Sequence, residues 1–393
     1  MTRHLNGLCR IDDKTRLQRT HCRHQFCPYT AVRMLNIMLV NTTKLLLIPL
    51  RRTFVFALLL SAYSLTAQDI HFSQFGNSPL NLNPGLAGVF GGDLRFVGNY
   101  RQQWRTVRVP YTTFSGSVEN KVYLTRGRYD KFVTASLLLN YDKQGDLALK
   151  SLQIGIPIAV TLPIGKSNFI SVGATPMFGQ RSFDTDEISF GEQYIDGMYD
   201  PGSAITEDLS VTNLKYFDFS AGANLRLQSP KKRSRLDLGA AMHHINRPAH
   251  DFWASSVTAN DDVRLYNKLT LYGLGLFQLS EKFDLLAQGL YQQQGEYQEI
   301  VYGGGLRMHL NKARYKELAI QIGLDWRHRY NNSLVPRLEV FYGTWAFGAT
   351  FDWDAFSRAG ELVTERRGGP ELSVIYRLYK VKPLQKFKSC PII

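Results

Sequence analysis

The chain has 393 residues and a formal net charge of +14, yet ten of its 47 Lys and Arg, against two of its 33 Asp and Glu, lie within residues 1–67. The net charge of +6 that remains is scattered rather than gathered in a patch, which argues against a nucleic-acid partner. Only Cys390 lies beyond residue 67, so that part of the chain has no intramolecular disulfide.

The first element in chain order is a predicted signal peptide. Two basic residues, Arg51 and Arg52, precede a short apolar run at 54–62, and small residues follow up to Ala67. This pattern predicts export with cleavage between Ala67 and Gln68. The apolar run has roughly half of the ~20 residues that a spanning helix needs, so we do not interpret it as a membrane anchor.

The position of this signal predicts a later translation start. Signal peptides normally lie within ~30 residues of the start, so we expect translation to begin at Met34 or Met38. Residues 1–67 are then a misassigned extension followed by the signal peptide. The alternative is a genuine cytoplasmic extension that contains a buried apolar helix. No Cys stands at the predicted cleavage point, which argues against a lipoprotein.

The next segment, residues 68–92, is rich in Asn, Pro and Gly. These residues favour turns and extended backbone, so an ordered segment here must pack against another part of the protein. From Leu94 to Trp104, apolar and polar residues alternate with the period of a strand.

Similar alternating segments rich in Gly, Tyr, Phe and Leu continue to residue 379, and no convincing amphipathic helix interrupts them. We count about fourteen predicted strands, with the 338–353 segment divided by a turn near Gly343. The segments after the first are 112–120, 132–141, 152–162, 169–179, 216–227, 236–245, 269–279, 283–294, 300–310, 318–328, 338–353 and 371–379. Two long connections, 183–215 and 246–268, separate some of them.

Aromatic residues at the strand ends favour a membrane protein. Tyr100, Tyr141, Trp326 and Trp353 are examples, and the face opposite the apolar one carries Arg, Asn, Gln, Lys and Asp. Aromatic girdles, a lipid-facing apolar surface and a polar interior are typical of an outer-membrane barrel. We therefore predict an antiparallel transmembrane β-barrel over residues 93–379, and the alternative is a soluble periplasmic β-sandwich or propeller.

Three motifs at the start of the predicted mature chain carry a family resemblance. They are QDIHFSQ at 68–74, NSPLNLNPGLAG at 77–88 and RQQW at 101–104. Together they resemble the PorP/SprF family, outer-membrane proteins of the Bacteroidetes type IX secretion and gliding-motility machinery. The corner at 244–248 and the Cys-Pro pair at 390–391 also match family features, so the resemblance spans the mature chain. The sequence departs from the family at Phe75 to Ser78 and at Gly85.

The resemblance implies a non-enzymatic outer-membrane protein that docks periplasmic ring components or anchors a secreted adhesin. Because such barrels begin in the periplasm, we expect residues 68–92 at the periplasmic mouth. There the segment would plug the pore, present backbone to a partner by strand addition, or only pack the barrel end. The hypothetical partner-binding residues are Phe72, Gln74, Asn81, Asn83, Pro84, Gly88, Arg101 and Trp104. The basic tail, 380–393, is expected to be periplasmic and either to contact peptidoglycan or a ring protein, or only to add solubility.

Enzymatic and metal-binding patterns are weak. His243 and His244 are adjacent, so on a strand they would face opposite sides and could not share a metal. The acidic residues at 184–187 lack the spacing of an EF-hand, and we interpret them as a solvated loop. We therefore predict no catalytic, cofactor or metal site. Two further classes stay open: a diffusion pore or transporter, and an outer-membrane lipid hydrolase that would use His244 with a serine.

Overall fold

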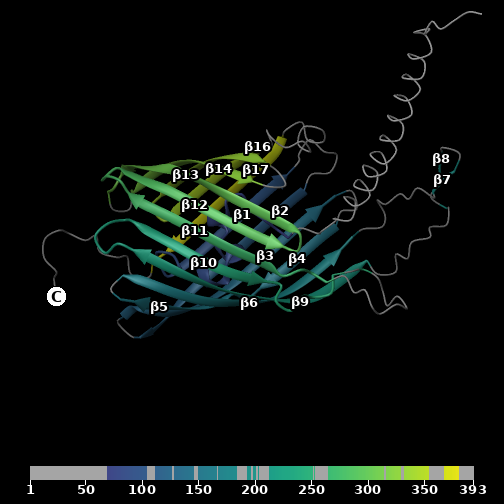
Figure 1. Ribbon diagram of the computed structural model, residues 1–393, viewed down its shortest axis with the longest axis horizontal. Helices are drawn as coiled ribbons and strands as arrows, with labels where there is room; N and C mark the ends of the chain where they lie inside the picture. The colour runs from purple at the N-terminus through teal and green to yellow at the C-terminus, as the bar shows by residue number, and fades with distance from the viewer. Residues whose placement is uncertain are drawn as a thin grey trace, which may run out of the picture. The chain divides into compact units, whose positions relative to one another are not determined.

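A computed structural model (Figure 1) describes residues 69–379. Its gaps are residues 104–110, 126–127, 146–148, 166, 184–192, 196–197, 201, 203–211, 251, 253–263, 314–315, 329–331 and 354–366. The predicted signal peptide, the tail at 380–393, Trp104 and the acidic residues at 184–187 lie outside the described residues.

Strands dominate the described chain, as the alternation of apolar and polar residues predicts. Their bounds are β1 (Leu94–Gln103), β2 (Tyr111–Thr125), β3 (Arg128–Gln144), β4 (Leu149–Gly155), β5 (Ile158–Ile164), β6 (Asn168–Ser182), β7 (Tyr194–Ile195), β8 (Met198–Tyr199), β9 (Asn213–Gln228), β10 (Arg235–His243), β11 (Lys268–Gln278), β12 (Phe283–Gln294), β13 (Tyr297–Asn311), β14 (Leu318–His328), β15 (Ser333–Tyr342), β16 (Trp345–Trp353) and β17 (Arg367–Leu378). Among the described residues, β7 and β8 pair only with each other, within the long connection between β6 and β9.

The other strands form one closed wall. β4 and β5 are two parts of a single strand, because both pair with β3 and β6 in one register and are separated only at Ile156 and Pro157. Proline has no N–H to donate, which explains the interruption. β1 pairs with both β2 and β17, so fourteen antiparallel strands close into a barrel within the described residues. The predicted fold and strand number are confirmed.

The two faces of the wall reverse the arrangement of a soluble protein. On β14, Ile322 and Leu324 point outward and are 65% and 52% exposed, whereas Gln321 and Asp325 point inward and are 1% exposed. Exposed aromatic side chains lie at the strand ends; they include Tyr342, Trp345 and Trp353. An apolar outer surface between aromatic strand ends is suited to contact with lipid. A polar interior is typical of the lumen of a membrane barrel and not of the core of a soluble sandwich. The barrel is therefore an outer-membrane barrel and not a soluble sandwich.

The two ends of the barrel differ in their connections. At the end where β1 begins and β17 ends, here called the turn end, short turns such as residues 279–282 and 343–344 join the strands. The opposite end, here called the loop end, carries the long connections at 183–212 and 244–267. Among the described residues, no helix combines the length and the hydropathy needed to cross a bilayer.

Residues 69–93 lie inside the barrel and are here called the plug (Figure 1, purple). The plug contains three short helices: η2 (Phe75–Asn77), α2 (Pro79–Leu82) and η3 (Pro84–Leu86). Pro79 and Pro84 stand at the first positions of α2 and η3, where their fixed φ suits a helix and the missing N–H costs nothing. The segment that we expected at the mouth of the barrel thus extends through its lumen.

Candidate functional site

The candidate site is the contact surface between the plug and the lumen wall, and it begins at the loop end. The Asp69 carboxylate accepts from Lys268 and lies 3.3 Å from His244 Nε2, while His244 Nδ1 lies 2.9 Å from the carboxylate of Asp218. Burial alone would lower the pKa of His244, but the two carboxylates raise it to about 9. Burial alone would raise the pKa of Asp69, but Lys268 and His244 hold it well below its ordinary value. These ion pairs fix the first described residue of the plug.

We expect this anchor to loosen as the pH rises through about 9. The pKa of His244 is about 9 in the folded protein and ~6.5 in an unfolded chain. Its stabilisation is therefore complete below a pH of ~6.5 and is lost as the pH passes 9, a difference of roughly 3 kcal/mol. Limited proteolysis of detergent-solubilised protein at a pH of about 6.5 and about 9.5 measures exposure of the plug's N-terminus. His244→Gln should expose it at both pH values, and equal protection of the unchanged protein at both would contradict the assignment.

A buried group of charges holds the next turn of the plug. Asp352 Oδ2 accepts from Arg101 at 2.7 Å and from Arg327 at 3.0 Å, and Asp352 Oδ1 accepts from the Ser73 hydroxyl at 2.5 Å. Arg327 also pairs with Glu299 at 2.8 Å. These residues come from the plug and from four strands, so the group joins the plug to distant parts of the wall.

The carboxylate of Glu371, on β17, binds the backbone of the plug. Its carboxylate accepts from the N–H of Ser73 at 2.7 Å and of Gln74 at 2.9 Å. The Gln74 side chain donates in turn to the Glu371 carbonyl at 3.1 Å and accepts from Ser373 at 2.7 Å. Asn77 continues the network by donating to Glu339 at 2.6 Å. The side chains of Ser73, Gln74 and Glu371 thus have the hydrogen-bond partners that burial requires.

Close backbone packing fixes the middle of the plug. The Asn83 side chain accepts from Gly85 N at 2.7 Å and donates to the carbonyls of Ala223 and Ala240. An added Cβ at Gly222 would lie 2.1 Å from Asn83 Oδ1, and one at Gly173 would lie 2.4 Å from the Pro84 carbonyl oxygen. Glycine on the wall is therefore required for the plug to approach so closely.

Aromatic and ionic contacts complete the plug near the turn end. The N–H of Gly88 donates to Glu119 at 3.0 Å, and Glu119 also forms a bidentate pair with Arg95 at 2.6 and 2.8 Å. The Phe90 ring lies 4.3 Å below both the Arg95 guanidinium and the Lys121 ammonium. The plug is thus bonded to the wall from one end of the lumen to the other.

The residues proposed from sequence for partner binding are mostly plug residues that face the wall. The buried ones are Phe72, Gln74, Asn83, Pro84, Gly88 and Arg101. Asn81 is half-buried and donates to Ser115 and Asn140. Sequence reasoning missed Asp352 and Glu371, whose only signal is a carboxylate on the inward-facing register of a strand. Partner binding by the eight residues stays a prediction.

The expectation about the two adjacent histidines, His243 and His244, was wrong. We expected their rings on opposite faces of a strand, but β10 ends at His243 and His244 has a φ of +57°. This turn directs both rings to the plug, where His243 Nε2 lies 3.4 Å from the Leu82 carbonyl oxygen and His244 contacts Asp69. Within the described ranges, no three His, Cys, Asp or Glu side chains are grouped to hold a metal ion.

Comparison with protein families indicates a membrane protein of a secretion system. A family described as "Type IX secretion system membrane protein PorP/SprF" matches residues 64–376. No curated protein sequence matches the chain. Among solved structures, the CymD monoaromatic hydrocarbon channel is similar over 80% of this chain and 95% of its own, with a TM-score of 0.42 and 10% identity. The COG4313 outer membrane channel from Pseudomonas putida F1 is similar over 72% and 95%, with a TM-score of 0.33 and 12% identity.

Proposed function

Because the chain belongs to the PorP/SprF family of type IX secretion system membrane proteins, we propose that it serves secretion by binding partner proteins at the two ends of a closed barrel. The turn end would face the periplasm and bind ring components of the machinery. The loop end would face the exterior and hold a secreted adhesin. The assignment of the ends follows the rule that outer-membrane barrels have short periplasmic turns and longer external loops.

The filled lumen is the observation that carries this proposal. Plug residues from Asp69 to Phe90 contact inward-facing side chains at the loop end, in the middle and at the turn end. A diffusion pore needs a continuous aqueous path, and a segment bonded along the whole lumen opposes one. What the barrel offers to a partner is therefore its ends.

Exposed lysines give the turn end a surface suited to an acidic partner. They are Lys231, Lys232, Lys282, Lys312 and Lys316. Charged residues at the edge of an interface steer a partner of opposite charge and speed its association. The basic tail beyond residue 379 would add to this charge, with peptidoglycan as a further candidate partner.

Affinity purification of a tagged chain from detergent-solubilised envelopes tests the proposal. Changing Lys231, Lys232 and Lys282 to Gln should reduce recovery of periplasmic ring proteins about tenfold, because three charges leave the turn end. The matched control changes three loop-end lysines to Gln: Lys143, Lys150 and Lys215.

The control variant should retain the ring proteins. If the loop-end variant instead loses a large secreted adhesin, the anchoring role at that end is supported. Equal recovery of ring proteins with both variants would show that the turn-end lysines do not dock them. Purification of the unchanged barrel without any secretion component would contradict the proposal as a whole.

A further inference from the structure

A cavity of about 230 Å³ lies in the lumen between the plug and the wall, toward the turn end. The plug side of the cavity includes Pro79, Leu86 and Phe90. Six arginines from six strands line the cavity: Arg95, Arg226, Arg235, Arg307, Arg337 and Arg377. Arg235, the first residue of β10, is exposed, so the cavity can be reached from the turn end.

Two of these arginines have their charge matched by a contacting carboxylate. Arg95 forms its bidentate pair with Glu119, and Arg226 forms one with Asp237 at 2.8 and 2.9 Å. Their guanidinium groups are therefore largely occupied by the protein itself.

The other four arginines are matched poorly. Arg307 donates to the neutral side chain of Gln321 at 2.9 and 2.7 Å, and Arg337 donates to Gln288 at 2.8 Å. Nη2 of Arg337 is 3.8 Å from Asp325, beyond hydrogen-bond distance. Nε and Nη2 of Arg337 are buried without a hydrogen-bond partner among the described residues.

Arg235 and Arg377 are the least matched. In the part of the chain that the structure describes, the Arg235 side chain has no hydrogen-bonded or ion-paired carboxylate, and Nε of Arg377 is buried without a partner. The positive charges of Arg226 and Arg307 are close enough to repel both guanidinium groups. The buried Nε of Arg377 is costly without a partner, and like charges held together are costly at both arginines unless an anion balances them.

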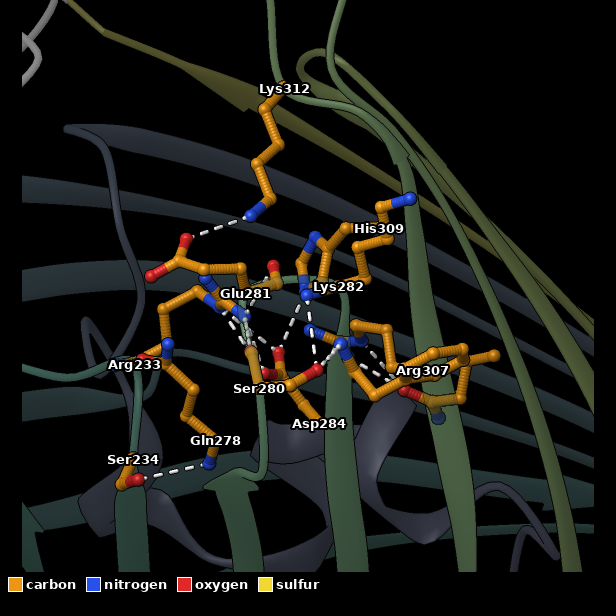
Figure 2. Close-up of polar contacts among 12 residues, drawn as sticks. Arg233, Ser234, Gln278, Ser280, Glu281, Lys282, Asp284, Arg307, His309 and Lys312 are labelled. Carbon is orange, nitrogen blue, oxygen red and sulfur yellow. Dashed lines mark hydrogen bonds and ion pairs between the residues drawn. The ribbon is translucent and has the colours of Figure 1, made fainter.

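The remaining charged groups around the cavity do not neutralise the excess of positive charge that the arginines bring. Glu339 accepts from Gln321 and Asn77, and Asp284 on the neighbouring rim lies between Arg233 and His309 (Figure 2). Lys121 and Asp93 lie at the edge with opposite signs. Six guanidinium groups thus face four carboxylates of the lining and its contacts, which are Glu119, Asp237, Asp325 and Glu339. The excess is two positive charges.

We infer that this cavity binds a phosphate-type oxyanion. A divalent anion balances the excess charge, and the guanidinium fork matches the oxygens of a phosphate group. The six arginines line the cavity from β1, β9, β10, β13, β15 and β17, so they suit a tetrahedral anion that accepts from several directions better than a single planar carboxylate. The phosphate group could belong to a phosphorylated lipid headgroup or to free inorganic phosphate. This inference does not depend on the proposed function.

Calorimetric titration of the detergent-solubilised chain tests it, at constant ionic strength with chloride as the competing anion. The probes are inorganic phosphate, pyrophosphate and glycerol phosphate. Arg235→Gln and Arg377→Gln should each raise the Kd at least about tenfold, because each removes a charged donor. Lys312→Gln is the matched control, because Lys312 lies at the same end and pairs with Glu281 outside the cavity lining.

The possible results distinguish a lipid headgroup from free inorganic phosphate, and both from the absence of an anion site. Binding of inorganic phosphate assigns the site to the phosphate group alone, and binding of glycerol phosphate only assigns it to a lipid headgroup. Absence of binding, or an unchanged Kd in both arginine variants, would overturn the inference. Arg235→Lys keeps the charge but loses the fork, so an intermediate Kd would distinguish a bound anion from general charge attraction.

Discussion

A chain that lacks residues 69–92 is expected to conduct ions at least about tenfold better in planar bilayers than the unchanged protein. The plug fills the polar lumen, and its removal leaves a water-filled interior lined by the charged residues that now bind it. Residues 1–68 stay in this variant so that export is preserved. The barrel itself should still close, because β1 begins at Leu94 and pairs with β2 and β17 without help from the plug.

A single substitution tests the same expectation with less disturbance. Gly222→Val places side-chain atoms where Asn83 now lies, since even a Cβ would be 2.1 Å from Asn83 Oδ1. The plug must then move, and conductance should rise. Gly289→Val is the matched control, because a Cβ there meets no atom within 4 Å. If neither the deletion nor the Gly222 variant conducts more than the unchanged protein, the plug does not close the lumen.

The wall of the barrel was predictable from sequence because its signal is local. Alternation along a strand decides which side chains face lipid, and each strand repeats it, so segments such as 318–328 and 283–294 match the observed β14 and β12. The family resemblance, carried by motifs such as 77–88, is confirmed by a match over residues 64–376.

The course of the plug was not predictable because its signal is not local. The Asn, Pro and Gly of residues 68–92 indicated packing against another element, but Gln74 binds Glu371, which lies 297 residues further along the chain. Asp69 reaches His244 only because β10 ends two residues earlier than the alternation suggested. Such contacts depend on the closure of the whole barrel, which no window of sequence contains.

Asp352→Asn is expected to have the largest effect on stability of any single charge change in the plug contacts. The substitution leaves the guanidinium groups of Arg101 and Arg327 beside one neutral amide, and both side chains are at least 95% buried. Breaking a buried ion pair by removing one partner costs about 3–5 kcal/mol. The Glu299 contact of Arg327 and the His71 carbonyl contact of Arg101 remain, so the barrel should fold with a lower unfolding free energy.

Urea unfolding in detergent or lipid vesicles measures this loss, with Glu281→Gln as the matched control. Glu281 also pairs with a cation, Lys312, but its side chain is 83% exposed, so its removal should cost no more than about 1 kcal/mol. Adding Arg101→Gln to Asp352→Asn removes the guanidinium group whose ion-paired carboxylate is lost, whereas Arg327 keeps Glu299. The double variant should therefore lose less stability than the sum of the two single variants. Additive losses would mean that Asp352 and Arg101 do not stabilise each other, and that the plug is held at this point by its backbone bonds to Glu371 instead.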